Sequence, residues 1–390
     1  MKKVSGRAIF PLILAIVLLA GTVLLCVRYF AKADEWVTFS GSPHVYTGVN
    51  LDGGVVTDRD GTLLLDSTDG RTYSADAVTR TATMHLLGDR YGYIQAPLLG
   101  SFADDMIGFD KINGLYGAEG TEANAALTLS AAAQTAAYQA LGNYHGTVGV
   151  YNYKTGEILC AVTSPSYDPD NMPDVDADTS GAYDGVYVNR FFQAAYTPGS
   201  IFKIVTLAAA IETVPDWENL TFTCEGKTII GGQEIICEGV HGTITLKQAL
   251  AHSCNVAFGE LAAELGAETL QDYAEKLGLT GSFSCEGYTV ASGKIDLSQA
   301  DDGDVAWAGI GQYTDQVSAP AFLRYMGAIA NGGQAAEPYL MQRVRKGDDI
   351  TYEAKTVLSD AVLKPETADT LTKLMRNNVQ SVYGDWQFGG

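Results

Sequence analysis

Residues 196–203 read YTPGSIFK, a Pro-Gly turn that leads into the apolar run 204–210. Ser200 and Lys203 stand at positions i and i+3, so on a helix their side chains share one face of the first turn. A lysine whose pKa is lowered by burial can take the proton of a serine hydroxyl, which then becomes a nucleophile. The positive end of the helix would stabilise the negative charge that develops. The same spacing also fits a helix-capping serine followed by a surface lysine, so a partner motif has to decide between the two.

A second motif, Ser253-Cys254-Asn255, follows Lys203 by 50 residues, early in a helical segment over 246–264. Ser-x-Asn after Ser-x-x-Lys is the second motif of penicillin-binding proteins and serine β-lactamases. In that pairing the serine can relay a proton to a leaving amine, and the asparagine can position the lysine and a substrate amide. The candidate catalytic residues are therefore Ser200, Lys203, Ser253 and Asn255.

Further segments match a single protein family from about Gly53 to the end of the chain. They are DRDGTLL (58–64), KTGEILCA (154–161), SPSYDP (164–169), Asn189-Arg190, GIGQ (309–312) and IANGG (329–333). With the two motifs, they make the chain resemble the class B penicillin-binding proteins, which are monofunctional, membrane-anchored D,D-transpeptidases of peptidoglycan synthesis. The stretch before Leu127 is too short for the glycosyltransferase domain of class A members. The chain is most similar to smaller class B members of the penicillin-binding protein A type.

The resemblance implies a fold, a reaction and partners. The fold would be α+β, a penicillin-binding/β-lactamase-like transpeptidase fold preceded by a small β-rich domain and one transmembrane helix. Ser200 would attack the D-alanyl-D-alanine bond of a stem peptide while Lys203 accepts its proton, and an amine of a neighbouring stem would take the acyl group. β-Lactams would acylate the same serine, and a membrane glycosyltransferase would be a partner. The resemblance implies neither a metal ion nor an organic cofactor.

Two features depart from the family pattern. Tyr313 follows Gln312 where relatives usually have glycine, which puts the geometry of that loop in question. The family's third motif, Lys-(Ser/Thr)-Gly, is missing after Ser200, and the Lys-Thr-Gly at 154–156 precedes Ser200 and has the chemistry of a turn. We therefore expect the sequence to be truncated before this motif, with an incomplete transpeptidase fold and an inactive chain, although the gene behind it would encode a working enzyme. Trp386 and Phe388 then resemble the approach to a core strand.

The N-terminus predicts a membrane anchor. From Ala8 to Val27 the chain has 20 uncharged, mostly apolar residues, enough to cross a hydrocarbon core of about 30 Å. A cleaved signal peptide ending at AKA (31–33) is the alternative, but the apolar run is longer than a signal peptide needs. We expect a cytoplasmic tail over 1–7, a transmembrane anchor over 8–30, a small domain over 36–125 and a transpeptidase domain over 126–390. The protein would then be single-pass in the cell membrane, with its bulk outside the cytoplasm.

Local patterns predict strands before a largely helical block, as in α+β proteins. Residues 54–57 and 62–65 flank a turn, and residues 146–151 and 157–162 form a second strand pair with a turn at 154–156. A Pro- and Asp-rich loop is predicted over 164–184. The predicted helices cover 127–141, 201–212, 246–264, 269–277, 319–331 and 365–378.

Charge and cysteine usage exclude some functions. The formal net charge is −21, and beyond residue 33 there are 20 basic against 46 acidic side chains, which argues against nucleic-acid binding. Neither CxxC nor HExxH spacing occurs, so we expect no metal site. Cys224 and Cys237 flank a Gly231-Gly232 turn, and we predict a disulfide between them on the paired arms of a hairpin.

Four alternative functions compete with the transpeptidase interpretation. A D,D-carboxypeptidase or a β-lactamase has the same motifs but transfers the acyl group to water, and the anchor and the 58–64 segment argue against both. A catalytically inactive scaffold or binding protein of the cell-wall synthesis machinery would not need the four intact site residues. A Ser-His-Asp hydrolase is disfavoured because the chain has no G-x-S-x-G segment.

Overall fold

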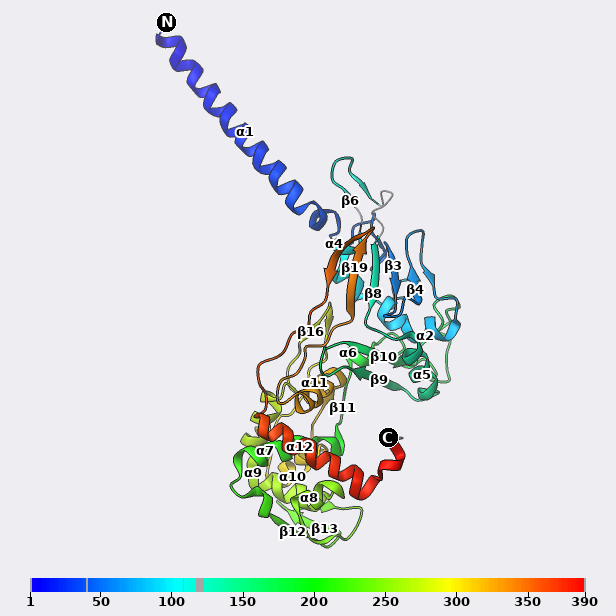
Figure 1. Cartoon of the computed structure of the whole chain (residues 1–390), viewed down its shortest axis with the longest axis vertical. Helices are drawn as coiled ribbons and strands as arrows, with labels where there is room; N and C mark the ends of the chain where they lie inside the picture. Colours follow the sequence, from blue (N-terminus) through cyan, green and yellow to red (C-terminus); the bar gives the residue numbers. More distant parts are fainter. Residues whose placement is uncertain (1, 40, 108, 117–122, 389–390) are drawn as a thin grey trace.

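A long N-terminal helix projects from the rest of the molecule in the computed structural model, which describes residues 2–39, 41–107, 109–116 and 123–388 (Figure 1). This helix, α1 (Lys2–Val37), has 36 residues and is therefore about 54 Å long. Its most apolar window has a mean hydropathy of 2.8, and none of that window is buried in the protein. Among the described residues it is the one helix long and apolar enough to cross a membrane.

A six-stranded sheet lies next to the end of α1, with strand order β20-β19-β8-β3-β4-β5. Its strands are β3 (Val55–Thr57), β4 (Leu63–Asp66), β5 (Thr72–Tyr73), β8 (Ala123–Leu127), β19 (Met341–Lys346) and β20 (Asp349–Glu353). The predicted strand–turn–strand is confirmed, since β3 and β4 pair antiparallel. Asp58 shapes the turn because its Oδ1 accepts hydrogen bonds from the amides of Asp60 and Thr62, at 2.9 and 2.8 Å. β19 pairs with β8, so this sheet also takes in strands from late in the sequence.

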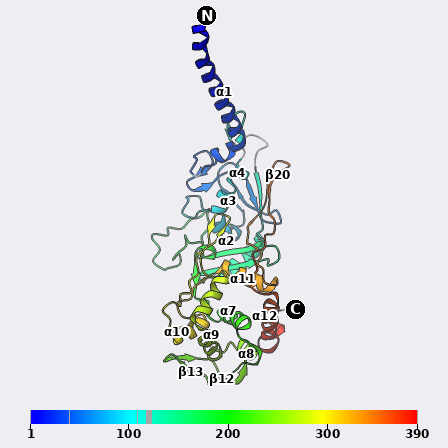
Figure 2. The ribbon, with the colours of Figure 1, turned by 90° about the vertical axis from the view of Figure 1, so that its left-hand side faces the viewer.

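The predicted β-hairpin of residues 146–162 is also confirmed. Its strands β9 (Gly146–Tyr151) and β10 (Ile158–Ser164) pair antiparallel, and α5 (Ala131–Leu141) packs against them. This helix begins later than the predicted residue 127 because 127 still belongs to β8 and Ser130 caps the first turn. A helical region lies at the end of the molecule opposite α1 (Figures 1 and 2). The mixture of strands and helices is the predicted α+β class.

The helical region contains most of the predicted helices. Its elements are η1 (Gly199–Phe202), α7 (Lys203–Thr213), α8 (Leu246–Ala251), α9 (Asn255–Lys276), α10 (Asp302–Gly309), α11 (Ala319–Ala330) and α12 (Pro365–Asn378). The helix predicted over 246–264 is wrong at its centre, because residues 252–254 interrupt it. The break predicted between the helices over 246–264 and 269–277 is confirmed, since Gly266 has a non-helical φ of +81° inside the span of α9. Buried residues of α7 and α9, such as Val205 and Phe258, form the core here.

Small hairpins and short helices complete the chain. They are β1 (Tyr46–Thr47), β2 (Asn50–Leu51), α2 (Ala77–Leu87), α3 (Pro97–Ser101), α4 (Ala103–Met106), β6 (Phe109–Asp110), β7 (Leu115–Tyr116), α6 (Arg190–Gln193), β11 (Ala195–Tyr196), η2 (Trp217–Asn219), β12 (Thr221–Cys224), β13 (Lys227–Ile230), β14 (Gln233–Ile236), β15 (Gly242–Thr245), β16 (Ser284–Cys285), β17 (Tyr288–Thr289), β18 (Val317–Ser318), η3 (Val379–Tyr383) and η4 (Asp385–Phe388). The last of these elements, η4, is a 3-10 helix in which Trp386 is 82% exposed, and the expectation that Trp386 and Phe388 lead into a core strand stays a prediction.

The predicted Cys224–Cys237 disulfide is also wrong, since all six cysteines are free. The Gly231-Gly232 turn does join two paired strands, β13 and β14. Cys224, however, lies on β12, which pairs with β15, and Cys237 follows the end of β14. The two cysteines are therefore not opposite each other on one hairpin.

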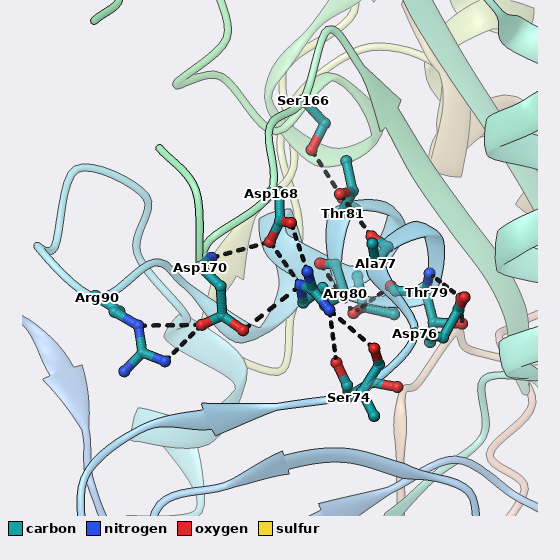
Figure 3. A network of polar contacts seen from close by, with 12 residues as sticks. Ser74, Asp76, Ala77, Thr79, Arg80, Thr81, Arg90, Ser166, Asp168 and Asp170 are labelled. Carbon is teal, nitrogen blue, oxygen red and sulfur yellow. Dashed lines mark hydrogen bonds and ion pairs between the residues drawn. The ribbon is translucent and has the colours of Figure 1, made fainter. Parts of the chain in front are cut away.

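A polar network joins α2 to the loop predicted over 164–184 (Figure 3). Arg80 makes a bidentate ion pair with Asp168, with both nitrogen–oxygen distances at 2.6 Å. The Ser166 hydroxyl donates to the carbonyl of Thr81 at 2.8 Å, and Arg90 pairs with Asp170. These contacts connect the small N-terminal region to the segment that follows β10.

We expect Arg80→Ala to lower the free energy of unfolding by about 1–3 kcal/mol, because bidentate, charge-assisted hydrogen bonds of low exposure are lost. The Arg80 and Asp168 side chains are only 16% and 22% exposed. Urea denaturation of the protein in detergent measures the loss. Lys373→Ala is the control, since its ion pair with Asp369 is 75% and 61% exposed and contributes less than about 0.5 kcal/mol. Equal losses in the two variants would show that the Arg80 pair adds no stability of its own.

Candidate active site

Lys203 stands at the centre of the four predicted site residues. Its Nζ lies 2.9 Å from Ser200 Oγ, 2.9 Å from Ser253 Oγ and 2.7 Å from Asn255 Oδ1. The carbonyl oxygen of Ser253 is a fourth neighbour, at 2.8 Å. The folded chain therefore brings together two motifs that are 50 residues apart in the sequence.

The turn before α7 presents Ser200 to solvent. Ser200 is exposed on the 3-10 turn η1, while Lys203, one turn later, is buried and only 1% exposed. Gly199 adopts a φ of +58°, which glycine reaches without steric cost. Its amide donates to the carbonyl of Gly311 at 2.9 Å. A Cβ on Gly311, whose own φ is +75°, would collide with the Gly199 backbone, so the GIGQ segment buttresses the serine turn.

Tyr313 fits the loop after this segment. Its φ is not positive, whereas the left-handed region would favour glycine. This position therefore accommodates a side chain, although relatives usually have glycine there.

The Ser253 segment is held in an unusual backbone conformation. Ser253 has a φ of +51°, a state that costs a non-glycine residue about 1–3 kcal/mol. It lies between α8 and α9, and Cys254 caps α9 by accepting from the amide of Ala257. The Asn255 Nδ2 donates to the carbonyl of Ile236 at 2.9 Å, which turns its Oδ1 toward Lys203. The segment thus aims two polar side chains at one ammonium group.

Burial lowers the pKa of Lys203 from 10.5 to about 8. Desolvation is the main cause, and the nearby Cys237, Cys254 and Glu238 oppose it by favouring the charged form. A lysine with this pKa is partly neutral at slightly alkaline pH and can accept a proton. The arrangement can therefore activate a serine hydroxyl without a histidine.

Sequence reasoning missed the supporting contacts of Gly311 and Ile236. Gly311 lies in the GIGQ segment (309–312), but nothing in the local sequence shows that it packs against Gly199. The carbonyl of Ile236 leaves no signal in the sequence, since any residue supplies one. As expected, the Lys-Thr-Gly at 154–156 is a turn between β9 and β10, where Gly156 has a φ of +91°.

The chain is similar to proteins of cell-wall synthesis. The family model of the penicillin-binding protein transpeptidase domain matches residues 146–389. A curated relative, the peptidoglycan D,D-transpeptidase PbpA of Mycolicibacterium smegmatis, is 29% identical over 65% of this chain and 55% of the relative. The chain spans about half the length of the curated relatives it matches first.

Two solved structures share its fold. The D,D-transpeptidase domain of a peptidoglycan glycosyltransferase from Eggerthella lenta has a TM-score of 0.72 at 25% identity, covering 85% of this chain and 82% of the other. Penicillin-binding protein A of Mycobacterium tuberculosis, as a ceftriaxone acyl-enzyme complex, has a TM-score of 0.70 at 25% identity, covering 84% and 80%.

Proposed function

Because this chain belongs to the penicillin-binding protein transpeptidase domain family, as a class B member with the predicted fold, we propose that it is a serine peptidoglycan D,D-transpeptidase. The observation that supports this proposal most directly is the position of Lys203, whose Nζ lies within hydrogen-bond distance of both Ser200 Oγ and Ser253 Oγ. A relative named as a peptidoglycan D,D-transpeptidase and a similar solved structure of a β-lactam acyl-enzyme complex support the same activity.

The proposed reaction has two steps. Ser200 Oγ attacks the carbonyl between the two terminal D-alanines of a stem peptide and forms an ester as the peptide bond breaks. Lys203 accepts the hydroxyl proton, and Ser253 relays that proton from Lys203 to the nitrogen of the leaving D-alanine, so both residues end the step as they began it. The amine of a second stem peptide then attacks the ester, which forms the crosslink and returns the proton to Ser200. The backbone amide of Ser200 would donate to the oxyanion.

The test separates transfer from hydrolysis. The full-length gene product in detergent is given a stem-peptide analogue ending in D-alanyl-D-alanine, together with a D-amino acid as the acceptor amine. Mass spectrometry should find the exchanged peptide as the main product. A product that is only the shortened peptide would replace the proposal with the D,D-carboxypeptidase alternative, and unchanged peptide would favour the inactive scaffold.

We also propose the cellular arrangement. Residues 8–30 of α1 would anchor the chain, with 1–7 in the cytoplasm, a small domain over 36–125 and a transpeptidase domain over 126–390 outside it. The exposed apolar surface of α1 supports the anchor, because lipid would cover it. A membrane glycosyltransferase that makes the glycan strands would be the partner.

The rate of penicillin acylation should rise with pH through about 8 and then level off. Only neutral Lys203 can accept the Ser200 proton, and burial places its pKa at about 8. Well below this value the rate should rise about tenfold per pH unit, because the neutral fraction does so. Stopped-flow or gel-based labelling measures the profile, with circular dichroism at each pH as the control for folding. A flat profile across this range would contradict Lys203 as the base.

A further inference from the structure

Three cysteines and a histidine meet directly behind the Ser253 segment. Cys224 ends β12, Cys237 follows β14, His241 precedes β15 and Cys254 caps α9. Their ligand atoms, three Sγ and one imidazole nitrogen, all lie within 4.8 Å of one another. Cys237 Sγ is 3.8 Å from Cys254 Sγ and 3.7 Å from His241 Nδ1.

These separations fit a tetrahedral metal ion. Zinc binds thiolate sulfur at about 2.3 Å and imidazole nitrogen at about 2.0–2.1 Å, so at tetrahedral angles two sulfurs lie about 3.8 Å apart, and a sulfur and a nitrogen about 3.5 Å apart. The Cys237–Cys254 and Cys237–His241 distances agree with these two values to within a few tenths of an ångström. Thiols that only pack in the hydrophobic core would not be expected to have an imidazole nitrogen at the fourth vertex of the tetrahedron.

Backbone N–H groups surround two of the sulfur atoms. The backbone amides of Gly239, Asn255 and Val256 lie near Cys237, and the amide of Ala257 donates to Cys254 Sγ at 3.5 Å. N–H donors of this kind stabilise a negatively charged sulfur. The ring of His241 stacks on that of His252 at 5.2 Å, which holds the imidazole in place. Cys224 and Cys254 are fully buried, so the cluster is closed to bulk water on that side.

We propose that Cys224, Cys237, His241 and Cys254 bind one Zn²⁺ ion as a closed structural site. Three soft thiolates and one imidazole select zinc over magnesium or calcium, which prefer oxygen ligands. Four protein ligands leave no open position for water, so the ion would not act on the substrate.

The site would tie three strands to the start of α9. Cys254 lies between Ser253 and Asn255, and Cys237 follows Ile236, whose carbonyl accepts from Asn255. The ligand spacing, C-x12-C-x3-H-x12-C, matches neither the CxxC nor the HExxH pattern of zinc sites, so the sequence alone predicts no metal site. Folding, rather than local spacing, brings the four side chains together.

The experiment is metal analysis of the full-length gene product, purified with reductant and without chelator. Elemental mass spectrometry should find about one zinc per chain, falling to a small fraction of that in Cys224→Ser and in His241→Ala. His241 is partly exposed, so its variant tests the site even if loss of buried Cys224 impairs folding. Cys160→Ser is the matched control, because Cys160 is equally buried but outside the cluster, and it should keep its zinc.

Cobalt provides a second readout. Co²⁺ added to metal-free, reduced protein should give the intense visible spectrum of tetrahedral thiolate coordination, and His241→Ala should weaken it. Wild-type protein that binds neither ion above the level of the variants overturns the proposal. So does a disulfide between two of the three cysteines in protein isolated without reductant. Neither readout uses penicillin or a stem peptide, so this proposal can fail while the transpeptidase proposal stands, and the reverse.

Discussion

The full-length gene product with Ser200→Ala should take up no labelled penicillin. Ser200 Oγ is the atom expected to form the covalent bond, and alanine offers no nucleophile. Its hydroxyl lies 2.9 Å from Lys203 Nζ on an exposed turn, which suits attack on an incoming carbonyl. Fluorescent penicillin, denaturing gel electrophoresis and mass spectrometry of the labelled peptide provide the measurement.

Ser253→Ala is the matched control, because Ser253 Oγ lies at the same distance from Lys203. We expect this variant to be labelled more slowly but still at Ser200, since a proton relay is lost and the nucleophile is kept. Both variants should unfold at temperatures close to that of the wild type. Label found on Ser253 would mean that Ser253, and not Ser200, is the nucleophile. A Ser200→Ala variant that is labelled at the wild-type rate would show that Ser200 is not the nucleophile.

The candidate site was largely predictable because its signals are local. Ser200 and Lys203 are related by the period of a single helix turn, and Ser253 and Asn255 are two positions apart. A contact between the two pairs could be expected only from the family resemblance, since 50 residues separate them. In the structure, Lys203 Nζ lies within hydrogen-bond distance of the other three side chains. Their roles in a reaction remain predictions.

The interruption of the helix over 246–264 shows where local patterns fail. Apolar periodicity continues through this segment, so it predicts one helix. Ser253 instead takes a positive φ, and α8 ends before it. That conformation is unfavourable locally and is offset by tertiary contacts, such as Lys203 with the Ser253 carbonyl. A break imposed by distant contacts leaves no trace in helix periodicity.

Non-local pairing explains why the predicted disulfide is wrong. The hairpin at Gly231-Gly232 was correctly placed, but the partner of β12 is β15, beyond that hairpin. The same pairing carries Cys224 away from the opposing arm and into the cluster with Cys237 and Cys254. Likewise, β19 joins β8 from more than 200 residues away, and neither strand shows this in its own sequence.

Replacing Lys203 by methionine should lower the acylation rate by about 10²–10⁴-fold, the usual contribution of a positioned general base. Methionine keeps the volume of the buried stem but cannot accept the Ser200 proton. It also leaves Asn255 Oδ1 and the Ser253 carbonyl without their donor, so the free energy of unfolding should fall by about 1–3 kcal/mol. Stopped-flow labelling gives the rate, and thermal unfolding gives the stability.

Lys203→Arg separates the two roles that Lys203 could have. Arginine keeps a positive charge beside Ser253 and Asn255 but holds its proton at any accessible pH, so it can orient these groups and cannot act as a base. If Lys203 is the base, this variant should be nearly as slow as Lys203→Met, and its residual rate should not rise through pH 8. Labelling at more than about a tenth of the wild-type rate would mean that a fixed cation suffices, and the proton of Ser200 would then have to leave by another route.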